Sequence, residues 1–185
     1  MPNINIALDI ETLSLQPTAA IIAIAAKTFE LPGEKIKRFS SREFFCNIDI
    51  VSSVMAGLTA SDDTLYWWQE QDEEVQKVCF SPDSSVTIKQ ALRKLKSFVA
   101  RIRSKAESIA IWTEGTDFDI PILRNAYFRV LDEKEPWDRS ELRDARTVIR
   151  LHNKPIPPPP YRICPHNPMD DVKQLIWNIT NIYKK

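Results

Sequence analysis

Glycine is scarce in this chain, with only three glycines among 185 residues. A phosphate-cradling P-loop and a dinucleotide-binding fingerprint both need several glycines close together, so the scarcity excludes both kinds of nucleotide site. Cysteine is scarce as well, and the three cysteines are odd in number and widely spaced. This pattern argues against a disulfide framework or a cysteine-type zinc site, and it indicates a reducing compartment.

Long hydrophobic runs and an excess of one charge are also absent. The longest purely apolar run, residues 19–26, is too short to span a membrane. Because no basic region or cleavage signal precedes the first predicted strand, we expect a cytoplasmic protein. The 25 basic and 25 acidic residues cancel, so any nucleic-acid binding must come from local patches. The length and the 43% share of hydrophobic residues predict one globular domain over residues 1–185.

Two acids end the first predicted strand, residues 3–12. Side chains alternate along a strand, so four apolar residues fall on one face, whereas Asp9 and Glu11 share the other. Two carboxylates this close repel each other, and burial strengthens the repulsion. A divalent ion such as Mg²⁺ or Mn²⁺ would relieve it. The pattern fits equally well a strand that has already ended, with both acids solvated in a loop.

The remaining sequence predicts a mixture of strands and helices. Residues 19–29 are apolar on both faces and predict a central strand. A third strand within residues 35–50 would complete a meander, and residues 108–112 form a fourth strand. Helices are expected over about 62–79, 86–105, 117–131 and 168–183, with a short one within 137–150. The prolines at 157–160 predict a stiff, extended connection across one end of the domain.

Helical periodicity separates neighbouring acids in two of these helices. Asp119 projects into an apolar stripe, whereas Asp117 projects away and is expected as an N-cap or first-turn acid. A carboxylate on an apolar face is costly unless it is paired or ligates a metal. A metal ligand is favoured here over an ion pair with an arginine or a misplaced helix start. In the last helix, Asp171 lies at the edge of the apolar stripe, Asp170 is expected in solvent, and His166 precedes Asp171 by five positions.

Two adjacent tryptophans, Trp67 and Trp68, lie in the helix expected over residues 62–79. Neighbouring residues on a helix point in different directions, so one can join the core while the other faces a cleft. A tryptophan in a cleft could stack a nucleobase. The alternative is that both are packing residues.

Three motifs, in this order, resemble the DEDDh 3′→5′ exonucleases, a family that includes polymerase proofreading exonucleases, RNase T and oligoribonuclease. The matching segments are Leu8-Asp9-Ile10-Glu11-Thr12, Gly115-Thr116-Asp117-Phe118-Asp119-Ile120-Pro121-Ile122-Leu123 and His166-Asn167-Pro168-Met169-Asp170-Asp171. Residues 64–71 and 143–147 are similar to a branch of small stand-alone bacterial and phage exonucleases, some acting on RNA. One departure is Pro168, where the family usually has a small residue, often alanine.

The resemblance implies an α/β protein of the RNase H-like fold. Its mixed central sheet would combine an antiparallel three-strand meander with parallel strands, flanked by α-helices. It also implies two divalent ions, Mg²⁺ or Mn²⁺, and a histidine that removes a proton from the attacking water. The implied metal ligands are Asp9, Glu11, Asp119 and Asp171, and the implied base is His166.

The implied substrate is DNA or RNA with a 3′ end, either single-stranded or in a 3′ overhang. The residues expected to contact it are Thr12, Trp67, Trp68 and Phe118. No membrane partner is expected, and a homodimer is left open. Three other functions stay open as well: a catalytically silent nucleic-acid-binding module, an endonuclease or resolvase of the same architecture, and a small-nucleotide phosphodiesterase. The complete set of acids counts against the first, and His166 counts against the second.

Overall fold

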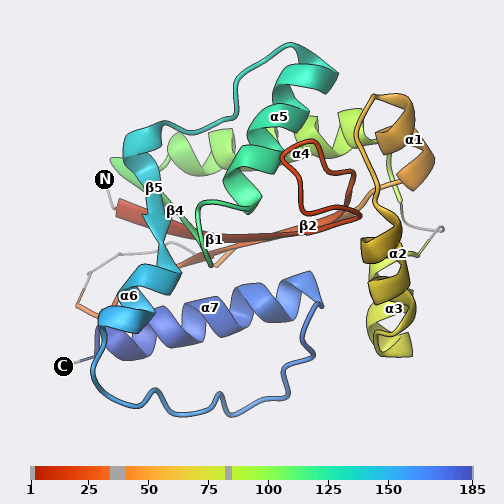
Figure 1. Cartoon of the computed structure of the whole chain (residues 1–185). Helices are drawn as coiled ribbons and strands as arrows, with labels where there is room; N and C mark the ends of the chain where they lie inside the picture. The colour runs from red at the N-terminus through yellow and green to blue at the C-terminus, as the bar shows by residue number, and fades with distance from the viewer. Residues whose placement is uncertain (1–2, 34–40, 82–84, 185) are drawn as a thin grey trace.

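A computed structural model of the chain describes residues 3–33, 41–81 and 85–184 (Figure 1). Its centre is a five-stranded mixed sheet with the strand order β3-β2-β1-β4-β5. Strands β1 (Asn3–Thr12), β2 (Ile21–Phe29) and β3 (Glu43–Asn47) form the predicted antiparallel meander. Strands β4 (Ser108–Thr113) and β5 (Leu142–Asp144) extend the sheet in parallel with β1. The predicted fold class is therefore confirmed.

Side-chain alternation along β1 separates two layers of core. Its isoleucines and Leu8 pack into the larger core, which includes residues of α4 (Ile88–Arg103) and α5 (Asp119–Leu131). Ala7, on the opposite face, packs into a smaller core with α7 (Pro168–Ile182). Figure 1 shows α4 and α5 on one side of the sheet and α7 on the other. Asp9 and Glu11 share the face of Ala7, and the carboxyl end of β1 therefore presents them on the α7 side.

In the larger core, a capping box begins α4 and a buried hydroxyl joins α5 to it. Thr87 and Gln90 form a capping box at the start of α4, two residues after the start predicted at residue 86. The Tyr127 hydroxyl of α5 donates a hydrogen bond of 2.8 Å to the carbonyl of Leu92 in α4. The helix start signals at residues 82–84 lie outside the described residues.

The region after β3 differs from the prediction. The single helix expected over residues 62–79 is two helices, α2 (Asp62–Gln69) and α3 (Glu73–Cys79). The break follows from a second N-cap, because the Asp72 carboxylate accepts the backbone N–H of Glu74 at 2.8 Å. The cap of α2 is Ser61 rather than one of residues 62–64. Ile50, expected in the third strand, instead begins α1 (Ile50–Met55) behind the cap residue Asp49, and residues 35–40 of that predicted strand lie outside the described residues.

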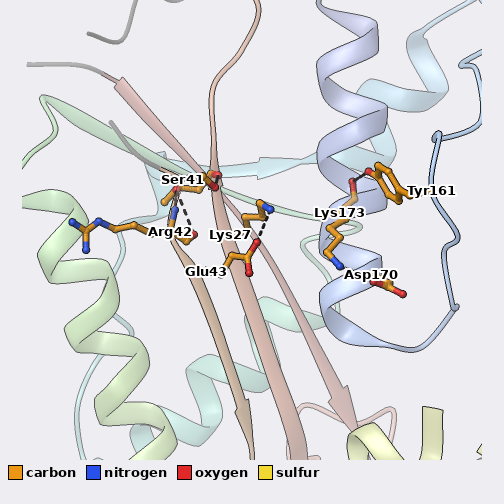
Figure 2. A network of polar contacts seen from close by, with 8 residues as sticks. Lys27, Ser41, Arg42, Glu43, Tyr161, Asp170 and Lys173 are labelled. Carbon is orange, nitrogen blue, oxygen red and sulfur yellow. Dashed lines mark hydrogen bonds and ion pairs between the residues drawn. The ribbon is translucent and has the colours of Figure 1, made fainter. Parts of the chain in front are cut away.

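The edge of the sheet at β3 is fixed by contacts to β2 (Figure 2). Lys27 Nζ lies 2.6 Å from Glu43 Oε1 across the two strands. The backbone N–H of Arg42 donates to Thr28 Oγ1 at 2.8 Å, and the Ser41 hydroxyl donates to the Thr28 carbonyl at 3.3 Å. An exposed ion pair contributes only about 0.2–1 kcal/mol, so these contacts set the register of the edge more than its stability.

The C-terminal third builds one more strand than expected. Residues 137–150 hold a 3₁₀ turn η1 (Arg139–Glu141), the short strand β5 and α6 (Ala145–Leu151), which Asp144 caps. The proline-rich connection then runs along the outside of α7 (Figure 1). The Trp177 indole N–H donates to the Pro157 carbonyl at 2.7 Å, and the Tyr161 hydroxyl donates to the Lys173 carbonyl at 3.2 Å. Among the described residues, no helix is both long enough and apolar enough to cross a membrane.

Candidate active site

The four acids expected to act together come from three elements that meet at the carboxyl end of β1. Asp9 and Glu11 belong to β1, Asp119 is the first residue of α5, and Asp171 lies in the first turn of α7. Their charges act on one another, since Asp119, Glu11 and Asp171 each raise the pKa of Asp9. The structure thus brings the four predicted carboxylates into one cluster.

Burial gives this cluster its unusual electrostatics. Burial, followed by the charges of Asp171 and Asp119, raises the pKa of Glu11 to about 9. Burial also raises the pKa of Asp9 well above its usual value. One carboxylate oxygen of Asp9, Oδ2, is buried and has no hydrogen-bond partner among the described residues. Buried carboxylates this close cannot all ionise unless a cation compensates their charge.

Asp119, at the start of α5, is hydrogen-bonded to β1 at Ile10, the residue between Asp9 and Glu11. Its Oδ1 accepts the backbone N–H of Ile10 at 3.3 Å, and its side chain is buried. Burial raises the pKa of Asp119 to about 7, against the lowering effects of the Ile10 hydrogen bond and the Arg146 charge. The prediction that Asp117 is an N-cap or first-turn acid is wrong, because Phe118 occupies the N-cap and the helix begins at Asp119. The exposed Asp117 carboxylate instead lies 3.5 Å from Arg146 Nη1.

His166 stands beside Glu11 and Asp171 at the start of α7. One ligand atom from each of these three side chains lies within 4.8 Å of the others. The backbone of His166 is left-handed, with φ of 64°, and the Asn167 side chain next to it caps α7 by accepting two backbone N–H groups. The backbone N–H of His166 lowers the pKa of Asp171, although burial is the larger effect and raises that pKa to about 6. Burial lowers the pKa of the His166 imidazole.

The prediction that Asp170 lies in solvent is wrong, although its carboxylate is not one of the converging ligand atoms of Glu11, His166 and Asp171. Its carboxylate accepts a hydrogen bond from Lys173 Nζ at 2.9 Å (Figure 2) and another from the backbone N–H of Cys164 at 3.3 Å. The side chain is only 19% exposed. The connection before α7 folds back over this carboxylate, which a helical phase alone does not reveal.

A pocket of about 410 Å³ opens next to the acidic cluster. It contains Glu11 and His166 and all four residues expected to contact the substrate; its lining is Glu11, Thr12, Leu15, Asp63, Thr64, Trp67, Trp68, Phe118 and His166. Sequence reasoning missed Leu15, whose side chain is 74% exposed at the pocket rim. No signal in the sequence marks it, because an isolated leucine after a strand has no diagnostic spacing.

The two tryptophans have different roles in the wall of this pocket. Trp68 is 3% exposed, and its indole N–H donates to the Thr12 carbonyl at 2.9 Å. Trp67 is 38% exposed, and its ring meets the His166 ring edge to face with centroids 4.7 Å apart. Trp68 therefore forms part of the core that supports the pocket, whereas Trp67 is a partly exposed residue of its wall.

The fold matches that of solved exonucleases. E. coli exonuclease I bound to single-stranded DNA, in a zinc ion-bound form, aligns with a TM-score of 0.56 and 16% identity, over 95% of this chain and 39% of that chain. The same enzyme with a dA16 oligonucleotide aligns with a TM-score of 0.56 and 16% identity, over 97% of this chain and 40% of that one. This chain spans about two fifths of the length of exonuclease I. The predicted RNase H-like exonuclease fold is confirmed.

A comparison of the sequence with protein families narrows this fold class to one family. Residues 4–183 match the family described as the 3′-5′ exoribonuclease Rv2179c-like domain. The chain belongs to this family. No curated protein matches it closely enough to serve as a relative.

Proposed function

We propose that this chain is a 3′→5′ exonuclease that hydrolyses phosphodiester bonds of a single-stranded nucleic acid from its 3′ end. The observation that carries the proposal is the meeting of four buried or half-buried carboxylates and His166 beside an open pocket. Membership of the exoribonuclease family supports it. We further propose that residues 1–185 act as one exonuclease domain, because segments from both ends of the described chain form the cluster.

RNA is the substrate that the family description favours. The exonuclease I structures, in turn, hold single-stranded DNA. A single strand suits the pocket, because the partly exposed Trp67 in its wall offers an aromatic ring on which an unpaired base can stack. We therefore take single-stranded RNA as the first substrate to test, with DNA of the same sequence beside it.

The residues present fit divalent metal ions. The partnerless Asp9 Oδ2 and the three converging ligand atoms form a set of donors that suits a cation. Carboxylate oxygens are the ligands that Mg²⁺ and Mn²⁺ prefer. We infer that Asp9, Glu11, Asp119 and Asp171 hold two such ions. When bound, the ions lower the pKa of a water molecule and stabilise the leaving oxygen.

His166 is proposed as the general base rather than as a metal ligand. The carboxylates already supply hard oxygen ligands, so the imidazole is left to accept a proton. Because burial lowers its pKa, the ring is neutral near pH 7 and can do so. The edge-to-face contact with Trp67 and the Asn167 cap next to it hold the ring beside Glu11 and Asp171.

The direct test uses RNA and DNA oligonucleotides carrying a label at either end, with Mg²⁺, with Mn²⁺ or with EDTA. We expect 5′-labelled strands to shorten stepwise and 3′-labelled strands to release a labelled mononucleotide at once, with no reaction in EDTA. Internal fragments would indicate an endonuclease, and cleavage confined to dinucleotides would indicate a small-nucleotide phosphodiesterase. Binding without cleavage under every condition would leave a silent binding module.

A further inference from the structure

Arg146 is a cation held against the turn between β4 and α5, which leads into Asp119. It is the second residue of α6 and belongs to none of the predicted catalytic motifs. Its Nη1 lies 3.5 Å from Asp117 Oδ1, two residues before Asp119, so the guanidinium lies beside the turn that leads into Asp119. Helix α6 packs on the same side of the sheet as α7 (Figure 1). A positive side chain therefore stands near the carboxylates that would bind the metal ions.

The turn between β4 and α5 is shaped to accommodate this guanidinium. Arg146 Nη2 donates to the Glu114 carbonyl at 2.9 Å, and Nη1 lies 3.5 Å from Asp117 Oδ1. At Gly115, whose φ is +101°, a Cβ atom would lie only 2.5 Å from Arg146 Nη2 and 2.7 Å from its Cζ. Gly115, which opens the Gly-x-x-Phe-Asp segment, thus leaves room for Arg146 as well as allowing the turn.

The interactions within the protein use only part of the donor capacity of Arg146. A guanidinium has five N–H donors in a planar fork. The Glu114 carbonyl accepts one of them, and the contact to Asp117 is a long one to a side chain that is 78% exposed. The Arg146 side chain itself is 44% exposed. Donors on a fixed, half-exposed guanidinium therefore remain available beside the cluster.

A nucleic-acid strand approaching this site brings its own negative charges. The cluster carries several carboxylates, so it repels the phosphates that flank the bond to be cleaved. An arginine fork matches a phosphate geometrically and bonds it with two donors at once. We propose that Arg146 binds a backbone phosphate of the strand beside the acidic cluster and so positions it. This inference rests on the proposed function and assigns a positioning role.

The test is the salt dependence of binding to a single-stranded oligonucleotide with uncleavable phosphorothioate linkages, measured with Mg²⁺ present. Each phosphate contact to a single strand contributes a slope of about −0.7 in the logarithm of affinity against that of salt concentration. We expect Arg146→Gln to reduce the slope by about that amount, so its binding defect shrinks about fivefold over a tenfold rise in salt. Arg146→Lys should keep the wild-type slope, because it keeps the charge.

Arg150→Gln is the matched control, since it removes the same charge from an exposed position four residues further along α6. We expect it to keep the wild-type slope. If Arg146 only braces the turn, Arg146→Gln and Arg146→Lys will both weaken binding with an unchanged slope, and the inference is overturned. If the wild type shortens 3′ ends but Arg146→Gln keeps the full slope, the inference about Arg146 is overturned and the proposed function stands. A wild-type chain that neither binds nor shortens any strand overturns the proposed function too.

Discussion

His166 depends on a backbone conformation that few residues adopt. Its φ of 64° lies in the left-handed region, where asparagine is the best tolerated side chain after glycine. The thiol of Cys79 donates to the His166 carbonyl at 3.5 Å, which adds a second anchor to this residue. The position of the imidazole thus comes from the backbone around it as much as from the ring's own contacts.

Replacing His166 tests its role as the base. General acid–base catalysis contributes about 10²–10⁴-fold to a rate, so we expect His166→Ala to lose at least about 100-fold in single-turnover rate with Mg²⁺. His166→Asn should lose as much and is the safer variant for folding, because asparagine tolerates the left-handed backbone. Thermal unfolding should show both variants folded. A full rate in either variant would remove His166 from the mechanism.

Much of the site at the level of single residues follows from periodicity alone. Alternation along β1 is enough to put Asp9 and Glu11 on one face, and the phase of α5 is enough to turn Asp119 inward. Arg146 and Leu15 could not be found this way, because their places depend on how a later helix and a surface turn pack in three dimensions.

At the scale of elements, α2 carries two adjacent tryptophans with separate duties. Trp68 packs edge to face on Phe80, with ring centroids 5.2 Å apart, and its N–H donates to the carbonyl of Thr12, the residue after Glu11. Trp67 faces the pocket and His166. The Ser61 cap fixes where this helix begins, just ahead of the two tryptophans.

Alanine variants separate the two duties. We expect Trp68→Ala to cost about 3–5 kcal/mol of unfolding free energy, since it empties a buried aromatic site, as measured by urea unfolding. Trp67→Ala should leave stability nearly unchanged but weaken substrate binding by about 1–3 kcal/mol, the value of stacking one base. The KM for 5′-labelled RNA measures that loss. Equal stability losses in the two variants, with an unchanged KM for Trp67→Ala, would contradict this division.

The elements that sequence patterns missed are the short ones. Strand β5 has three residues, and α1 and α3 have six and seven. Elements of that length carry too few periodic positions to show a pattern, and here side-chain caps such as Asp49 and Asp72 determine where they begin. The long elements β1, α4, α5 and α7 were predicted within about two residues of their observed ends.

At the scale of the whole molecule, the buried acids make the stability of the metal-free fold depend on pH. The carboxyl groups of Glu11, Asp119 and Asp171 have pKa values of about 9, 7 and 6, against about 4 in an unfolded chain. Between these values the folded state binds more protons than the unfolded state, so stability falls as pH rises. The window runs from about pH 4 to about pH 9, and Glu11, together with Asp9, contributes to its upper half.

This linkage predicts how stability responds to pH and metal together. In EDTA, we expect the free energy of unfolding to fall by about 2 kcal/mol from about pH 6.5 to about pH 8. Across this range Glu11 keeps its proton in the folded chain and lacks it in the unfolded chain, so unfolding releases a proton. Urea unfolding at the two pH values measures the change. Mg²⁺ should restore stability more at the higher pH, and Glu11→Gln should reduce the fall, leaving the part that Asp9 and Asp119 contribute. A stability in EDTA that rises across this range would contradict the prediction.

The measurement that bears most directly on the acidic cluster is calorimetric titration of Mn²⁺ into the metal-free chain. We predict binding of two ions by the wild type, a severe loss for Asp171→Asn, and near-normal binding for Asp170→Asn, whose carboxylate is committed to Lys173 and Cys164. No heat of binding in the wild type, or equal binding in Asp171→Asn, would contradict the claim that these carboxylates share divalent ions.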